Sequence, residues 1–133
     1  MGIELFERAA EAGGQILRVE RADASEGGGS ALAYLLTFDV GRIWVRSDPL
    51  AGGVAAELAE GAPEGPTGLV SVDDEEPWWR VLGEPLRRAW ETADGDARGF
   101  RLQFRSDDDK PRFVLLTPAG GLVRAGLEAS HVR

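Results

Sequence analysis

The chain has 133 residues, a formal net charge of −8, no cysteine and 43% hydrophobic residues. This length predicts a single domain, residues 1–133, that buries one core without disulfides or metal ions. The lack of cysteine excludes disulfides, thiolate metal sites and a cysteine nucleophile. The acidic charge disfavours sequence-independent binding to nucleic acid, which depends on cationic contacts with phosphate.

The N-terminal residues argue against a secretory signal. Residues 1–8 carry two glutamates and lack a long apolar run. No later segment approaches the length of a membrane span. We therefore expect a soluble cytoplasmic protein with no membrane partner.

The first part of the chain predicts a short helix followed by a strand. Apolar side chains recur at helical spacing over 3–12, and Gly13 and Gly14 follow where a helix end favours glycine. Residues 15–21 then alternate between apolar and charged, which is the period of a half-buried strand. The glycine-rich residues 25–30 lack the lysine of a phosphate-binding loop, so we interpret them as a hairpin loop.

Residues 31–58 predict a series of strands. Residues 31–39 are apolar on both sides, which is typical of a central strand covered on both faces. After a turn, Trp44 lies between Arg42 and Arg46 on one face of the next strand. These arginines either stack on the indole and cover it or present it as a contact surface. Residues 54–60 are ambiguous, and their position among hairpins favours a strand.

The tryptophan-rich stretch that follows a short strand at 68–72 predicts a helix. Acidic residues precede Pro77, and the apolar residues between Trp78 and Trp90 recur at helical spacing. Proline in Gly83-Glu84-Pro85 predicts a kink, so one piece runs from Pro77 to about Leu82 and the other from Pro85 to about Ala93. We expect Trp78 to pack inside. Trp79 is either half-buried or an exposed anchor for a partner.

Three further strands are expected after this helix. Residues 99–106 alternate most clearly, with Arg101 and Arg105 facing outward, and residues 112–117 and 122–127 follow. The acidic residues at 94–99 lack the final ligand of a calcium loop, and those at 107–109 suit a solvated hairpin tip. We therefore expect no metal ion and no cofactor.

A helix of the pattern Trp-x3-Leu-Gly-x2-Leu-x3-Trp, here Trp78 to Trp90, precedes a Gly-aromatic strand, here Gly99-Phe100. This arrangement resembles a group of small uncharacterised bacterial domains. The resemblance covers a small part of the chain. It implies an architecture and no mechanism, because the group has no established activity.

These elements predict an α+β fold: an antiparallel sheet of about six or seven strands in hairpin order, with one kinked helix packed on a face and a short N-terminal helix. The residue inventory does not favour an enzyme. The only histidine, His131, lies near the C-terminus, and no catalytic residue is assigned.

We expect a non-catalytic bacterial protein-binding module, such as a neutralising or accessory partner protein. The first alternative is a small-molecule-binding or catalytic domain with a helix–sheet cleft, where Glu75 and Glu76 are polar anchors. The lesser alternative is an acidic DNA mimic, indicated only by the charge.

The candidate binding residues are arginines and tryptophans on outward positions. If their strands share an open face, Arg42, Arg46, Arg101 and Arg105 form a basic and aromatic patch around Trp44 that receives an acidic partner or a second copy of the chain. The competing interpretation is that these arginines pair with neighbouring carboxylates on an ordinary solvated face. Trp79 is then the remaining anchor.

Overall fold

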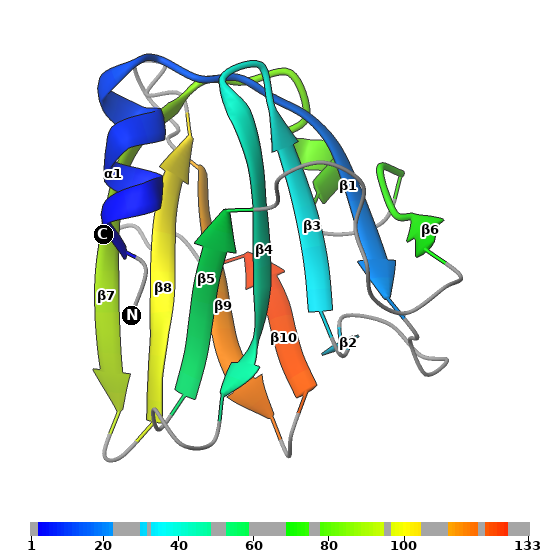
Figure 1. The fold of residues 1–133 in the computed structure, drawn as a ribbon, viewed down its shortest axis with the longest axis vertical. Coiled ribbons are helices and arrows are strands. Elements are labelled where there is room, and N and C mark those ends of the chain that lie inside the picture. Colours follow the sequence, from blue (N-terminus) through cyan, green and yellow to red (C-terminus); the bar gives the residue numbers. More distant parts are fainter. Residues whose placement is uncertain are drawn as a thin grey trace.

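The computed structural model describes residues 3–22, 30–31, 33–48, 53–58, 69–74, 78–94, 97–104, 112–119 and 122–127. Its elements in chain order are the helix α1 (Ile3–Glu11), the strands β1 (Ile16–Ala22), β2 (Ser30–Ala31), β3 (Ala33–Phe38), β4 (Gly41–Asp48), β5 (Gly53–Leu58) and β6 (Leu69–Ser71), the 3-10 turn η1 (Trp78–Arg80), and the strands β7 (Leu86–Asp94), β8 (Ala97–Phe104), β9 (Arg112–Ala119) and β10 (Leu122–Leu127). Strands dominate this part of the chain (Figure 1).

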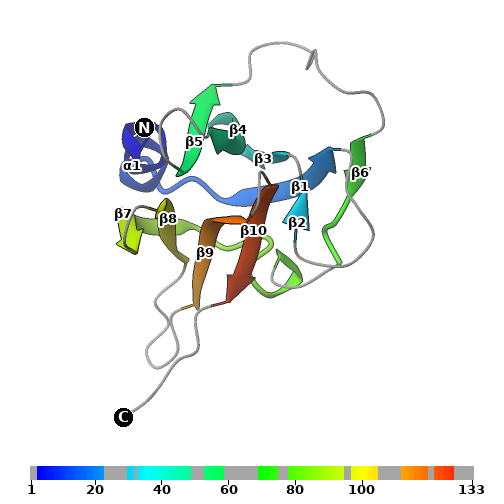
Figure 2. The same cartoon turned by 90° about the horizontal axis from the view of Figure 1, so that it is seen from below.

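The strands form one curled sheet in the order β2-β10-β9-β8-β5-β4-β3-β1-β6, and β7 pairs with the other side of β8. Seen from below, β1, β3, β4 and β5 lie in one layer and β7 to β10 in the other (Figure 2). The helix α1 lies at the side where β5 and β7 face each other across the molecule. The sheet therefore encloses its own core, with α1 covering one side.

Two sets of backbone contacts hold the two layers together. The strands β5 and β8 meet at a single parallel bridge, Gly53 with Arg98. At the other end of the molecule, the Ile16 N–H donates to the Glu84 carbonyl at 3.2 Å, and the Gly83 N–H donates to the Ile16 carbonyl at 2.7 Å. These contacts join the start of β1 to the approach to β7.

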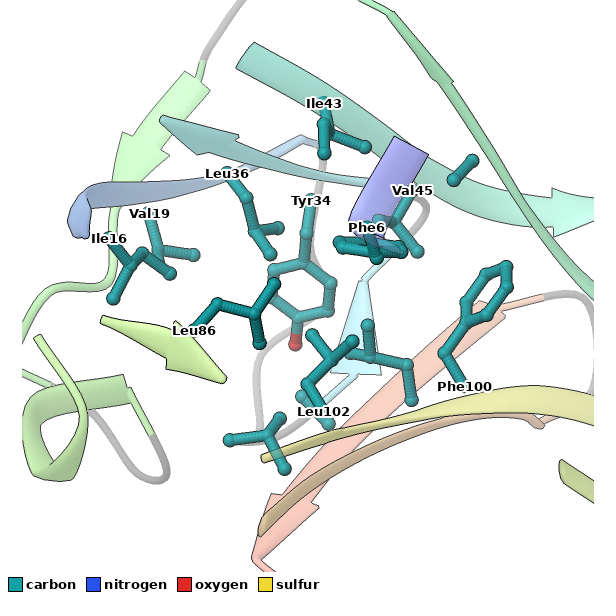
Figure 3. Close-up of a cluster of buried hydrophobic side chains, with 14 of the residues drawn as sticks. Phe6, Ile16, Val19, Tyr34, Leu36, Ile43, Val45, Leu86, Phe100 and Leu102 are labelled. Atoms are coloured by element: carbon teal, nitrogen blue, oxygen red, sulfur yellow. The ribbon is translucent and has the colours of Figure 1, made fainter. Parts of the chain in front are cut away.

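The core lies between the inner faces of the two layers. Figure 3 shows aliphatic and aromatic side chains from both layers converging with Phe6 of α1. The rings of Phe6 and Phe100 lie 5.3 Å apart between centroids, and those of Tyr34 and Trp78 lie 5.5 Å apart. Such tilted aromatic pairs contribute about 0.5–1.5 kcal/mol beyond the area they bury.

Several local predictions are confirmed. The helix α1 ends as its glycines predict: Gly13 has φ +69°, and the Gly14 N–H donates to the Ala9 carbonyl at 2.8 Å. The strand β3 is buried on both faces at most positions, as expected of a central strand. Residues 53–58 form β5, so the ambiguous segment is a strand over its described part.

The predicted α+β fold with a kinked helix from Pro77 to Ala93 is wrong. Only Trp78–Arg80 forms a helical turn, and Leu86–Asp94 is the nine-residue strand β7. Gly83 adopts φ +84°, a left-handed conformation that ends the turn. The short helix Pro77–Leu82 is therefore reduced to a single 3-10 turn within its described residues.

A β-bulge explains why this strand resembled a helix. The register of β7 against β8 shifts between Leu86 and Arg88, so two arginines occupy the space of one residue. The inward-facing residues Leu86 and Ala89 are consequently three positions apart, which matches helical spacing. Beyond the bulge the period of two returns, and Trp90 faces away from the core that contains Ala89.

The expected hairpin order holds only in part. Consecutive strands pair antiparallel from β3 to β5 and from β7 to β10. However, β1 lies between β3 and β6, β2 pairs with β10, and β5 pairs in parallel with β8. The ten described strands also exceed the six or seven expected.

We predict that Gly99→Ala strongly destabilises the fold. A Cβ atom at Gly99 would overlap the Leu116 carbonyl oxygen across the β8–β9 pair, so the backbone must move. Overpacking of this kind costs about 1–3 kcal/mol. Urea unfolding should show this loss. Gly126→Ala in β10 is the matched control, because no atom lies within 4 Å of its added Cβ, and its effect should stay within about 0.5 kcal/mol. Equal effects would contradict the close approach at Gly99.

Candidate partner-binding surface

The outer surface of β7 to β10 carries the most distinctive set of side chains in the described chain. We call it the basic outer face. Strand register places its residues opposite the buried core positions of the same strands. The described side chains on this face are Arg88, Trp90, Thr92, Arg101, Gln103, Phe113, Leu115, Thr117 and Arg124.

An arginine held by two aromatic rings forms the centre of this face. Arg101 of β8 lies directly opposite Trp90 of β7, and Phe113 of β9 lies diagonally from it. The Arg101 guanidinium carbon is 4.9 Å from the Trp90 ring centroid and 4.2 Å from the Phe113 ring centroid. Each such contact is worth about 0.5–1 kcal/mol at an exposed site. All three side chains are partly exposed, so they are accessible from solvent.

The basic outer face contrasts with the charge of the whole chain. Its described side chains include three arginines and no carboxylate, although the full sequence has a net charge of −8. Acidic side chains lie elsewhere, and α1 exposes Glu4, Glu7 and Glu11. Among the described side chains, the basic outer face is therefore distinguished by arginines that have no carboxylate beside them on the same face.

The outer face around Trp44 is different because a carboxylate pairs with one of its arginines. Strand register places Glu57 beside Trp44, and the Arg46 Nε donates to Glu57 Oε2 at 2.7 Å. Both side chains are about half exposed, so this pair contributes less than about 1 kcal/mol. For Arg46, the structure supports the interpretation of an ordinary paired surface. Arg42 lies on the same face and is partly exposed.

The predicted patch that combines Arg42, Arg46 and Arg101 around Trp44 is not formed. The neighbours of Trp44 and of Arg101 point into one core from opposite layers, as Figure 3 shows for Ile43, Val45, Phe100 and Leu102. Alternation then places Trp44 and Arg101 on outer faces that point in opposite directions. Arg105 lies outside the described residues.

Of the two tryptophans in η1, Trp78 packs inside, as the sequence predicts, and Trp79 lies at the surface. Trp78 is 1% exposed and contacts the ring of Tyr34, whereas Trp79 is 50% exposed. The Arg80 guanidinium carbon lies 4.4 Å from the Trp79 ring centroid and covers part of it. Trp79 is thus a partly covered exposed aromatic residue, and its role as an anchor stays a prediction.

Within the described part of the chain, three hollows adjoin α1. One, of about 270 Å³, lies between α1 and the β3–β4 turn and is lined mainly by apolar residues, including Val40 and Leu58. Two others, of about 500 and about 390 Å³, lie between α1 and β7 and share Ala10, Arg87 and Arg88. Glu75 and Glu76, the anchors expected in a helix–sheet cleft, lie outside the described residues.

Sequence reasoning found Arg101 but missed its partners. The helical spacing from Trp78 to Trp90 predicts Trp90 on an apolar helix face, and Phe113 lies in the predicted strand 112–117 with no binding role. The alternation of Arg88, Trp90 and Thr92 with the buried Ala89 was a signal for a strand with a polar outer side. The pairing of Trp90 with Arg101 depends on strand register, which local sequence does not specify.

Comparisons with known proteins found no matching family model, curated protein or solved structure. The resemblance to small bacterial domains therefore stays a prediction. Within the described residues, histidine and carboxylate side chains form no cluster of three or more that could hold a metal ion. The described helices include none that is long and apolar enough to cross a membrane. The acidic residues at 107–109 lie outside the described residues, as do residues 95 and 96 of the acidic segment at 94–99.

We predict that the two neighbouring tryptophans differ sharply in their contribution to stability. Trp78→Ala should lower the free energy of unfolding by about 3–5 kcal/mol, because it removes a buried ring from the core. Trp79→Ala should cost less than about 1 kcal/mol, because its ring is half exposed. Chemical unfolding of both variants measures the difference. A large loss for Trp79→Ala would show that this ring is structural and would weaken its candidacy as an anchor.

Proposed function

We propose that the chain is a non-catalytic protein-binding module that binds an acidic segment of a partner through the basic outer face. The observation that carries this proposal is the Arg101 guanidinium, which lies against both the Trp90 and Phe113 rings on a face whose described side chains include no carboxylate. Arginines and aromatic rings on an exposed sheet can bind the carboxylates of another chain.

Stacking prepares Arg101 for this role. A planar guanidinium that packs its flat side on aromatic rings still directs its N–H groups from its edge, and these can bind a carboxylate with two hydrogen bonds. The rings also restrict the rotamers of the side chain, which lowers the entropy lost on binding. Aromatic residues and arginine are also the residue types enriched at interface hot spots.

The rival proposal of a catalytic or small-molecule cleft has less support. The hollow of about 270 Å³ is lined by apolar residues and by one charged side chain, Arg8. The two hollows beside β7 contain Arg87 and Arg88, with Glu7 and Glu11 around the smaller one. These arginines and glutamates lie at an open surface, where charged side chains are expected without any ligand.

The proposal predicts that Arg101→Glu weakens binding of an acidic peptide by about tenfold or more, equivalent to about 1.4 kcal/mol. The probe is a fluorescein-labelled glutamate-rich peptide, titrated with the protein at low ionic strength and followed by fluorescence anisotropy. Binding should weaken as salt is added, because both partners are charged and exposed.

Arg42→Glu is the matched control, because it makes the same change of charge on the opposite layer beside Trp44. When the titration is repeated at about 0.15 M ionic strength, where the Debye length falls to about 8 Å, this variant should keep an affinity within about twofold of the parent protein. Equal losses of affinity in both variants would show that the effect comes from net charge alone. This result would contradict a specific site at Arg101. Tighter binding of an oligothymidylate than of the peptide would replace the acidic protein partner with single-stranded nucleic acid.

A further inference from the structure

The strand β7 has one open edge. It pairs with β8 along one side from Leu86 to Asp94. On its other side, the described residues provide only the bridge between Gln15 and Pro85 and a hydrogen bond of 2.8 Å from the Leu86 N–H to the Gly14 carbonyl. Beyond Leu86, no described strand pairs with this edge. An unpaired edge of this kind is a template for a further strand.

The hydrogen bond at Leu86 shows which residues of β7 direct their backbone toward the open edge. Along a strand, residues whose side chains lie on the same face also direct their N–H and C=O groups to the same edge of the strand. Leu86 faces the core and its N–H points toward Gly14. Ala89 also faces the core, so its backbone groups point to the open edge, whereas those of Trp90 point to β8.

Space is present beside this edge. The hollows of about 500 and about 390 Å³ lie against β7 between Leu86 and Trp90, and Ala10 of α1 lines both. The wall opposite β7 is thus α1, which contributes the small Ala10 to both hollows and Glu7 and Glu11 to the smaller one. A groove between a helix and an open strand edge suits an extended peptide, which adds backbone hydrogen bonds to the sheet and side-chain contacts to the helix.

We propose that the acidic partner segment is extended and joins the sheet as a strand along the open edge of β7, in the groove beside α1. This inference rests on the proposed function and names its binding mode. The added strand places alternate side chains on the basic outer face, beside Arg88 and Trp90, with Arg101 one strand further along the sheet. The intervening side chains face α1 at Ala10. The preferred partner therefore carries carboxylates at every second position.

Backbone methylation of the peptide tests this mode. The probe is a short peptide in which glutamate alternates with threonine, compared with one version N-methylated at each threonine and one at each glutamate. In an added strand, only one of these two sets of amides faces β7. One methylated peptide should therefore lose at least tenfold in affinity while the other binds like the parent. A loss of affinity in the peptide methylated at threonine indicates an antiparallel added strand. A loss of affinity in the peptide methylated at glutamate indicates a parallel one.

Two observations on the protein complete the experiment. Hydrogen exchange at the Ala89 amide should slow when the unmodified peptide binds, because this amide faces the open edge. Ala10→Phe should fill the groove and weaken binding at least tenfold. Ala12→Phe, which faces the apolar hollow on the other side of the helix, is the control and should bind like the parent protein. Thermal unfolding of both variants verifies that each is folded.

The outcomes separate this inference from the function on which it rests. If both methylated peptides bind alike, or if Ala10→Phe binds normally, strand addition is overturned. Arg101→Glu then decides the function by itself: a loss of peptide binding upholds the basic outer face as a docking surface for side chains alone. If the parent protein binds no glutamate-containing peptide, both proposals fall.

Discussion

The close approach of β5 to β8 and of β8 to β9 determines the architecture. At Gly53 and Gly99 the backbone of another strand occupies the space that a side chain would need, namely that of Arg98 and of Leu116. Only glycine permits such contacts. They let β5, β8 and β9 converge, so the sheet curls and its two inner faces bury a common core. The hydrogen bonds between Ile16 and residues 83–84 join the layers at the other end.

This curl also determines how the surface is divided. Because the inner faces share one core, the outer faces of the two layers point in opposite directions and can carry unlike chemistry. One presents Trp44 with Arg46 bound to Glu57, and the other presents Arg101 stacked on Trp90 and Phe113. If the proposed function holds, the arginines on this outer face would help to orient an acidic partner and increase the rate of productive encounter.

Most strands were predictable because their side chains alternate against a single core. The alternation at 99–106 and the two-sided burial of β3 follow directly from the sequence. The region 77–93 was not predictable in this way, because a 3-10 turn, a left-handed glycine and a β-bulge together produced apolar residues at helical spacing. Periodicity distinguishes helix from strand only where the strand is regular. The pairing of β5 with β8 depends on contacts distant in sequence, for which local pattern carries no signal.

The candidate site was half predictable for a related reason. In the sequence of its own strand, Trp44 lies between two arginines and therefore resembles a binding site. Trp90 resembles one less, because Arg88 lies two residues before it and Glu91 follows it directly. Cross-strand neighbours reverse that order: Trp44 lies beside Glu57, whereas Trp90 lies opposite Arg101. On the first surface Arg46 pairs with a carboxylate, whereas on the second Arg101 packs against two aromatic rings. Register, rather than composition, therefore decides which of these arginines has a carboxylate neighbour and which has aromatic neighbours.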